Sequence, residues 1–267
     1  MRLILALLSL LAALPAAAQQ RPPSHCLALA SGLTHLVPVG FRDPVAADRV
    51  RITYIDHAMF LIQTPAVSAI TDFTGLIGDV AYLPDVVTMN NAHGTHWTTT
   101  PDPAIPHVLQ GWAVDGTAAA HTLDLGEMLI RNVPTDIQSR SGTVRPNGNS
   151  IFVFEAAGLC IGHLGHLNSQ PTPEQFAALG RMDVVLVPVD GGLTMDLPTV
   201  LAVMDRLRAR VVIPMHWRGR GTLDAFLAGM ATQFDVLQTD ENEIILSQNQ
   251  LPARPTVIVL QPARLAD

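Results

Sequence analysis

The histidines of this chain are the residues whose type and spacing along the sequence most clearly suggest a chemical function. The chain of 267 residues holds ten of them, and five follow shortly after apolar runs that are typical of β-strands: His93 and His96 after DVVTM, His163 and His166 after LCIG, and His216 after VVIP. In α/β architectures, ligands gather at the carboxyl ends of strands. Neutral imidazole is the commonest metal ligand, and a His-x-x-His pair with distant single histidines suits zinc. One histidine alone is more often a hydrogen-bonded structural residue, so it is the set that predicts a metal site.

Strands dominate the half of the chain that carries the first four of these histidines. Apolar and alternating runs, which indicate strands, occur at 51–57, 59–64, 67–72 and 85–89, and then over HVLQGW, EMLIRNV, SIFVFE and LCIGH. We expect this half to be a β-meander.

Helices enter the pattern after residue 170. In Thr172-Pro173-Glu174-Gln175 a capping residue, a proline and a glutamine predict a short helix through Leu179, which Gly180 ends. The apolar run DVVLVPV predicts a strand buried on both faces. Further elements are expected as a helix near 197–208, a strand at 210–215, a helix near 222–231, and strands near 243–248 and 256–260. Strands first, and alternating strands and helices later, indicate an α+β fold of two sheets packed face to face with helices outside.

One domain accounts for most of the chain. Residues 1–18 combine the basic Arg2, an apolar run and the small residues Ala16-Ala17-Ala18, which indicate a cleavable signal peptide and a periplasmic or secreted protein. Residues 19–48, rich in proline and small residues, are expected to form an N-terminal arm over the domain. The remaining stretch, 49–267, shows no internal repeat or linker, and a single core is ordinary at that length.

Charge and composition narrow the kind of partner. The 16 basic residues are all arginine and stand against 23 acidic ones, a formal net charge of −7 that becomes −8 once Arg2 leaves with the signal peptide. This balance disfavours nucleic acid and an anionic membrane surface as partners, and the lack of lysine excludes Schiff-base chemistry on a lysine. After the signal peptide, no apolar stretch is long enough to span a bilayer. The partner we expect is therefore a small-molecule substrate.

The two cysteines, Cys26 and Cys160, leave two interpretations open. Export to an oxidising compartment would allow one disulfide between them. Alternatively, Cys160, inside the apolar run GLCIG, is a small buried hydrophobic residue.

Six segments between residues 50 and 220 occur in an informative order: ITYIDHAMFLIQT, TDFTG, DVVTMNNAHGTHW, GNSIFVFEAAGLCIGHLGH, DVVLVPVDGGLTMD and VVIPMHW. Each of them resembles, in the same order, one segment of the metallo-β-lactamase superfamily. These family segments are the Gly-His strand pair, the Asp-Pro strand end, the His-x-His-x-Asp-His loop, the hairpin that ends in His-x-Gly-Asp, the Pro-Val-Gly-Gly segment and the segment with the last metal ligand. The branch that the chain resembles contains the ascorbate-6-phosphate lactonases and related phosphodiesterase-like hydrolases. The resemblance implies a four-layer αββα fold, with two mixed β-sheets flanked by helices.

The metal-ligand motif departs from this family at several positions. The first histidine of the six-residue loop motif is Asn91 and its aspartate is Thr95. The family's mid-chain histidine should fall in NVPTDIQSR, where Asp136 is the nearest candidate, and the aspartate after the hairpin is replaced by His166. Two metals normally need a carboxylate that bridges them. The resemblance therefore implies one ion more readily than two.

The histidines that remain suffice for that one ion. Three imidazoles with an open position are the arrangement of catalytic zinc, and they suit iron too. If the ligand positions of the family are carried over, the resemblance implies His96, His166 and His216 as the metal ligands, with His93 as a fourth ligand or a hydrogen-bonding neighbour. His163 is expected to support the loop, as the matching residue does in the family.

A few other residues are candidates for supporting roles. Asp190, in PVDGG, and Asp136 are candidate proton acceptors, and Asp190 is also a candidate hydrogen-bond partner for a metal-bound water. Asp72 resembles the family's carboxylate that orients the histidine loop, although an ordinary turn aspartate fits as well. His57, at the position of the family's opening histidine, is either a core histidine or part of the pocket wall.

Three functions stay open on the sequence. A zinc-dependent hydrolase would activate water against an ester, lactone, amide or phosphodiester. The lost ligand positions instead favour a non-hydrolytic metal- or ligand-binding protein on the same fold, whereas the gain of His166 argues against simple decay. An iron-dependent oxidoreductase is the third reading, because imidazoles also suit iron. We favour the hydrolase.

Overall fold

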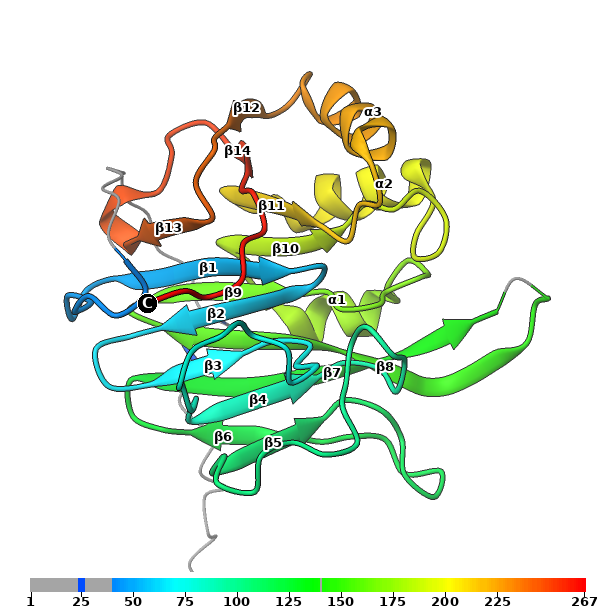
Figure 1. The fold of residues 1–267 in the computed structure, drawn as a ribbon. Coiled ribbons are helices and arrows are strands. Elements are labelled where there is room, and N and C mark those ends of the chain that lie inside the picture. Colours follow the sequence, from blue (N-terminus) through cyan, green and yellow to red (C-terminus); the bar gives the residue numbers. More distant parts are fainter. Residues whose placement is uncertain (1–23, 27–39, 140) are drawn as a thin grey trace, which may run out of the picture.

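Two β-sheets form the frame of the computed structural model, which describes residues 24–26, 40–139 and 141–267 (Figure 1). The six-stranded sheet has the order β13-β1-β2-β3-β4-β5 and the eight-stranded sheet the order β12-β14-β11-β10-β9-β8-β7-β6. The smaller sheet contains β1 (Val50–Asp56), β2 (Met59–Gln63), β3 (Ser68–Ile70), β4 (Val86–Met89), β5 (His107–Gln110) and β13 (Glu243–Leu246). The larger sheet contains β6 (Thr122–Asp124), β7 (Met128–Gln138), β8 (Val144–Ala156), β9 (Leu159–His163), β10 (Val184–Pro188), β11 (Val211–Met215), β12 (Asp235–Gln238) and β14 (Thr256–Val259).

Both sheets are mixed, so the expected meander is only partly present. β1, β2 and β3 pair antiparallel, and so do β6 to β9. In contrast, β3, β4 and β5 are parallel neighbours. The meander prediction is wrong for this stretch because the connections over 71–85 and 90–106 are long enough to return the chain to the opposite end of the sheet, which parallel pairing requires.

The core lies between the two sheets and behind the larger one. Ile52 and Phe60 of the smaller sheet pack against Phe152, Leu186 and Ile213 of the larger sheet. Alternate residues of the same large-sheet strands point to the other face, which explains why the β10 run is buried on both sides, as predicted. Two packed mixed sheets of the α+β class are therefore confirmed.

Helices cover the outer face of the eight-stranded sheet. They are α1 (Pro173–Leu179), α2 (Leu197–Leu207) and α3 (Arg220–Met230), with a short 3-10 helix η1 (Gln248–Gln250). Val203 of α2 and Phe226 of α3 pack in one cluster with Val185 and Val212 of the sheet. Within the described ranges, the outer face of the smaller sheet is covered instead by loop and terminal residues such as Phe73, Ile77, Ile105 and Leu265.

Helix α1 has the bounds that its sequence signals predict. The Thr172 hydroxyl accepts from the backbone N–H of Gln175 over 3.2 Å, and the Gln175 side chain accepts from the N–H of Thr172 over 2.8 Å. Gly180, with a φ of 72°, ends the helix in a conformation that favours glycine. The short strands β6 and β12, by contrast, were not expected from the sequence.

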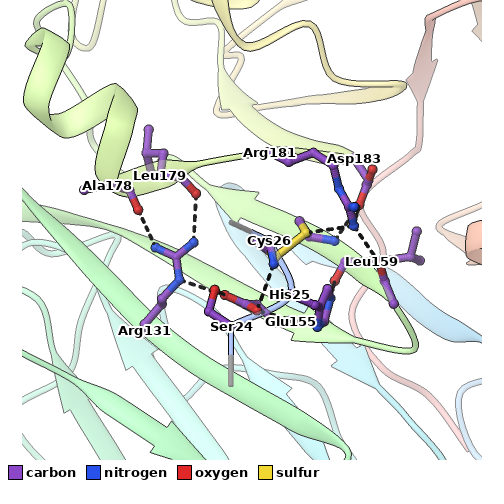
Figure 2. Close-up of a disulfide and its surroundings, with 12 residues drawn as sticks. Ser24, His25, Cys26, Arg131, Glu155, Leu159, Ala178, Leu179, Arg181 and Asp183 are labelled. Carbon is purple, nitrogen blue, oxygen red and sulfur yellow. Dashed lines mark hydrogen bonds and ion pairs between the residues drawn. A yellow bond between two sulfur atoms is a disulfide. The ribbon is translucent and has the colours of Figure 1, made fainter. Parts of the chain in front are cut away.

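A disulfide joins Cys26 to Cys160 of β9 and ties the segment 24–26 to the larger sheet (Figure 2). Both cysteines are buried, so Cys160 is also in the apolar surroundings that its sequence run suggested. The proposed signal peptide lies outside the described residues, and of the expected N-terminal arm the structure describes 24–26 and 40–48. No described helix has both the length and the apolar character needed to cross a membrane.

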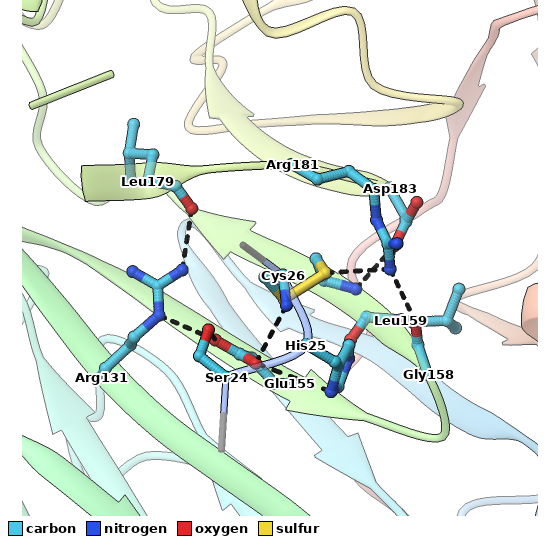
Figure 3. Close-up of polar contacts among 11 residues, drawn as sticks. Ser24, His25, Cys26, Arg131, Glu155, Gly158, Leu159, Leu179, Arg181 and Asp183 are labelled. Atoms are coloured by element: carbon cyan, nitrogen blue, oxygen red, sulfur yellow. Dashed lines mark hydrogen bonds and ion pairs between the residues drawn. A yellow bond between two sulfur atoms is a disulfide. The ribbon is translucent and has the colours of Figure 1, made fainter. Parts of the chain in front are cut away.

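Glu155 of β8 is the polar centre of this anchor (Figure 3). Its fully buried carboxylate accepts from Nε of Arg131 over 2.8 Å, from the Ser24 hydroxyl over 2.7 Å and from the N–H of Cys26 over 3.3 Å. Burial acts to raise the pKa of Glu155, but the Arg131 and Ser24 hydrogen bonds outweigh it and lower the pKa. The other guanidinium nitrogens of Arg131 donate to the carbonyls of Ala178 and Leu179 at the end of α1.

Candidate metal centre

Strand ends from both sheets meet at one site. β9, β10 and β11 are parallel neighbours, so their carboxyl ends share an edge, and they lead to His166, Asp190 and His216. In the smaller sheet, β3 and β4 are parallel and lead to Asp72 and His96. Hydrogen-bond distances between side chains of the two groups show that the two edges face each other.

The Asp72 carboxylate fixes the orientation of His96. Both side chains are fully buried, Nδ1 of His96 lies 2.5 Å from Oδ2 of Asp72, and the N–H of Asn90 donates to Oδ1 over 3.0 Å. Since the carboxylate accepts, Nδ1 of His96 carries the proton and Nε2 presents a lone pair. Asp72 thus makes the orienting contact that the sequence suggested, rather than serving as an ordinary turn residue.

Asp190 lies behind His216 in the same way. Its Oδ2 is 2.7 Å from Nδ1 of His216, an ion-pair contact that is not aligned as a hydrogen bond. Its Oδ1 accepts from the backbone N–H groups of Gly192, Leu193 and Thr194 over 2.8 to 3.0 Å. Burial acts to raise the pKa of Asp190, but His216 and these N–H groups hold it well below its usual range. The carboxylate is therefore charged, and its charge beside Nδ1 of His216 favours the tautomer in which Nε2 presents the lone pair.

The two free lone pairs point at each other. Nε2 of His96 and Nε2 of His216 are 3.1 Å apart. Two such lone pairs repel each other unless a proton or a cation lies between them. Nitrogens that are each about 2.0–2.1 Å from one tetrahedral zinc ion lie about 3.3 Å apart. The residues present therefore fit a bound metal ion.

Two further imidazoles flank the His96–His216 pair. The ring centroid of His57, in the β1–β2 turn, is 3.8 Å from that of His216, and its Nε2 is buried without a hydrogen-bond partner among the described residues. Ligand nitrogens of His57, His96 and His216 lie within 4.8 Å of one another. On the other side, Nδ1 of His166 lies 3.1 Å from Nε2 of His96. The sequence left His57 between core and pocket wall, whereas the structure places it in this imidazole cluster of His57, His96, His166 and His216.

The other two predicted histidines lie at the margins. His93 is exposed, and its ring stacks on that of His166 with centroids 5.4 Å apart. His163 is buried, with Nε2 2.7 Å from the carbonyl oxygen of Ala58 and Nδ1 3.2 Å from the amide nitrogen of Asn90. Both ring nitrogens of His163 are used, which fits the loop-supporting role expected from the sequence.

Burial keeps three imidazoles of the cluster neutral. Burial first, and the charges of neighbouring imidazoles next, lower the pKa of His57 and of His166 to about 3, and that of His96 well below its usual range. Burial raises the pKa of Asp72 to about 7. Neutral imidazole is the form that binds metals. His57, His96 and His166 can therefore take up an ion at neutral pH without first losing a proton.

Three of the seven non-glycine residues with a positive φ among the described residues lie at the same place. His57, Asp72 and His216 have φ values of 42°, 44° and 65°. Such values are uncommon for residues with a side chain, and they gather at functional sites when the surroundings enforce them. Here the carbonyl oxygen of His57 accepts from the N–H of His216 over 2.8 Å and from the Tyr54 hydroxyl over 2.6 Å.

The other residues that the sequence analysis singled out form contacts outside the imidazole cluster. Asp136 is exposed on β7, and its carboxylate accepts from the N–H of Asn147 over 2.8 Å, so the structure does not bring it into the cluster. Asn91 is buried, and its side-chain oxygen accepts a hydrogen bond from the guanidinium of Arg145 on β8. Sequence reasoning missed Arg145, because one arginine near a hairpin gives no signal by itself.

A cavity of about 390 Å³ continues from the loops that carry the cluster. It is lined mainly by uncharged polar residues, including Asn168, two residues after His166, and Gly192, two residues after Asp190. A larger cavity, of about 560 Å³, is lined by Thr53 and by residues of the 40–41, 241–243 and 263–266 segments. Neither of the two cavities is lined by a residue of the cluster itself, but the smaller one is lined by residues of the loops that carry the cluster. The smaller cavity is therefore the better candidate for holding a substrate.

Residues 51–216 match the family described as the beta-lactamase superfamily domain. The chain belongs to the beta-lactamase superfamily. The matched span begins in β1 and ends at His216, so it contains every imidazole of the cluster.

Relatives of this superfamily member share most of their length with it. A UPF0173 metal-dependent hydrolase of Nanoarchaeum equitans is 26% identical over 184 residues, which cover 63% of this chain and 84% of that protein. A UPF0173 metal-dependent hydrolase of Anaeromyxobacter dehalogenans is 25% identical over 244 residues, covering 76% and 88%. A solved structure from Thermotoga maritima, a candidate Zn-dependent hydrolase of the metallo-β-lactamase superfamily, is 28% identical with a TM-score of 0.58 and covers 79% of this chain and 98% of that one. The predicted superfamily and fold class are confirmed, and the ascorbate-6-phosphate lactonase branch stays a prediction.

Proposed function

We propose that this superfamily member is a metal-dependent hydrolase with one zinc ion bound between His96 and His216. The observation that carries the proposal is the pair of Nε2 atoms 3.1 Å apart, each on an imidazole whose other nitrogen contacts a buried carboxylate. Metal-binding histidines commonly donate their second ring N–H to such a carboxylate. The names of the Nanoarchaeum, Anaeromyxobacter and Thermotoga proteins support the same activity.

A single ion fits the side chains better than two. Two-metal sites need a shared ligand, normally a bridging carboxylate. Among the described residues, the carboxylates in ion-pair contact with the cluster are Asp72 and Asp190, and both lie behind an imidazole rather than between two ligand groups. Where the family has its first histidine, this chain has Asn91, which is bound to Arg145.

The side chains nearest the ion would bind it or orient the imidazoles that bind it. A bound zinc ion supplies Lewis acidity, which activates water and polarises a carbonyl or phosphoryl oxygen. Asp72 and Asp190 hold His96 and His216 in the tautomer that offers Nε2. Oδ1 of Asp190 is already occupied by three N–H donors, so its placement favours this orienting role over that of a proton acceptor.

The outer imidazoles complete the site. His57 and His166 lie on either side of the pair and are available as further nitrogen ligands. His93 is exposed and stacked on His166, so it forms the solvent side of the site. The substrate we propose is a small polar ester, lactone, amide or phosphodiester, because the neighbouring cavity is lined mainly by uncharged polar groups.

The test is turnover by metal-free and zinc-loaded protein on a panel of nitrophenyl esters, lactones, amides and bis(nitrophenyl) phosphate. We expect hydrolysis that requires zinc and is lost in His96→Ala and His216→Ala. Bound metal without turnover across the panel would contradict the hydrolase and support a binding protein. Stoichiometric iron with dioxygen chemistry would contradict it in favour of an oxidoreductase.

We also propose that the chain is exported, with residues 1–18 removed. The Cys26–Cys160 disulfide supports this, since disulfides persist in oxidising compartments. Expression of the full chain in a bacterium should place a product that begins at Gln19 in the periplasm, as read by terminal sequencing. Recovery of the uncleaved chain from the cytosol would contradict it.

A further inference from the structure

Arg145, an exposed residue of β8, brings a positive charge to the loop that carries His93 and His96. Its Nη2 donates to the side-chain oxygen of Asn91 and, over 3.1 Å, to the carbonyl oxygen of Gly148. Asn91 is two residues before His93, and its carbonyl oxygen accepts from the N–H of His93 over 2.7 Å. The N–H of His166 donates to Asn149, four residues after Arg145 on the same strand, over 3.0 Å. The guanidinium thus contacts the loop that carries His93, and it belongs to the strand whose Asn149 binds the loop that carries His166.

The local backbone holds Arg145 in this position. A Cβ atom on Gly148 would lie 2.5 Å from Nε of Arg145, so the side chain lies against the glycine. Both acceptors of Nη2, a carboxamide oxygen and a backbone carbonyl, are uncharged. Within the described part of the chain, Nε and Nη1 have no hydrogen-bond partner, and no carboxylate is within ion-pair distance of the guanidinium.

The surroundings leave this charge uncompensated. Asp72 and Asp190 are buried and occupied by His96 and His216. Asp136, on the neighbouring strand, is exposed and bonded to a backbone N–H. On the far side of the cluster, Arg218 adds a second positive charge near His57, which Asp56 partly offsets. A guanidinium with free N–H donors beside a cation site is suited to an anion, because its planar fork matches carboxylate and phosphate oxygens.

We propose that Arg145 is a specificity-determining residue that binds an anionic group, a carboxylate or a phosphate, on the substrate. This inference rests on the proposed hydrolase function for the identity of the site. Asn91, at the position of the family's first histidine, orients the guanidinium instead of serving as a ligand for a second metal. The substrate is therefore anionic, although the chain as a whole is acidic.

Binding of inorganic phosphate to the full-length zinc-loaded protein, measured by calorimetry, tests the role of Arg145. Arg145→Gln should weaken phosphate binding at least about tenfold, the size expected for a lost charge-assisted hydrogen-bond pair, and Arg145→Lys should lie in between. Zinc content should be unchanged in both variants. Arg254→Gln, which removes an exposed arginine paired with Asp235, is the matched control and should bind like the wild type. Equal phosphate affinity in the wild type and Arg145→Gln, or no binding by the wild type, would overturn the proposal.

Hydrolysis of a matched pair of substrates separates this proposal from the proposed function. Nitrophenyl acetate is neutral, whereas mono-nitrophenyl succinate carries a carboxylate. Arg145→Gln should raise KM for the anionic ester at least about tenfold and leave that for the neutral ester unchanged. Zinc-dependent hydrolysis that Arg145→Gln changes equally for both esters would overturn the anion site alone. Phosphate binding that depends on Arg145 without any hydrolysis would overturn the hydrolase alone.

Discussion

Each of the two buried carboxylates determines what one imidazole can do. Asp72 and Asp190 contact Nδ1 of His96 and His216, which leaves the two Nε2 atoms facing each other at 3.1 Å. In a site without such partners, each imidazole could rotate or exchange tautomers, and the ligand geometry would be lost more easily. The carboxylates are therefore as much a part of the site as the imidazoles.

Asp72→Asn should weaken zinc binding about 10- to 100-fold while leaving the fold intact, since the amide oxygen keeps an acceptor for the N–H of Asn90 but the amide nitrogen cannot accept from Nδ1 of His96. Competition with a chelator of known affinity measures this. Asp136→Asn, which changes the same residue type outside the cluster, should leave zinc affinity unchanged. A larger loss in Asp136→Asn than in Asp72→Asn would contradict the assignment of roles.

Alanine variants of the four clustered histidines should fall into two groups. His96→Ala and His216→Ala remove the facing Nε2 atoms and should abolish stoichiometric zinc binding. His57→Ala and His166→Ala remove flanking nitrogens and should leave weaker but measurable zinc binding in the same titration. If His57→Ala or His166→Ala lost the ion while His216→Ala kept it, the central pair would be wrongly chosen.

At the scale of elements, parallel strands and a covalent anchor place the loops of the site. The carboxyl ends of β9, β10 and β11 share one edge, and Cys160, which carries the disulfide, lies three residues before His163 at the end of β9. The same segment is held by the buried Glu155 carboxylate (Figures 2 and 3). The disulfide and the Glu155 hydrogen bonds thus anchor the larger sheet, and the carboxyl ends of the strands in this sheet carry the candidate ligands.

The double variant Cys26→Ser and Cys160→Ser should lower the free energy of unfolding by about 2–4 kcal/mol, because the disulfide closes a long loop in the unfolded chain. Urea denaturation with and without a reductant measures this. Reductant should lower the midpoint of the wild type and leave that of the double variant unchanged. If complete reduction of the disulfide left the urea midpoint of the wild type unchanged, the stabilising role of the disulfide would be contradicted.

Glu155→Gln should destabilise the protein at pH 7 more than at acidic pH. The pKa of Glu155 is lowered below its ordinary value of 4.5 in the folded state. The stabilisation is therefore fully present above about pH 4.5 and is lost as the pH falls through the lowered value. Urea midpoints of the wild type and Glu155→Gln should converge below pH 4.5, with the exposed Glu241→Gln as a control. A constant difference at every pH would contradict the prediction.

For the whole molecule, sequence patterns predicted local elements better than their pairing. The capping signals of Thr172 and Gln175 depend on neighbouring residues only, and α1 has the expected bounds. The parallel pairing of β3, β4 and β5 depends on where two long loops return, which no local pattern encodes. The short strands β6 and β12 carry too few residues for a periodic signal and gain their order from β7 and β14.

The candidate site shows the same limit. His96, His166 and His216 could be proposed from the sequence because a histidine after a strand end is a local signal, and the structure brings these three side chains together. The position of His57 beside His216 depends on contact between two sheets, as does the contact of Asp190 with His216 rather than with solvent. Arg145 reaches Asn91 across two loops, so no spacing along the chain predicts it.

The central claim is that imidazoles from separate strand ends share one metal ion. Anomalous scattering at the zinc edge, from crystals of the zinc-loaded protein, measures the number and position of the ions directly. We predict one peak per chain, located between Nε2 of His96 and Nε2 of His216 and within bonding distance of both. Crystals with no peak there, or with zinc bound only at other residues, would contradict the account.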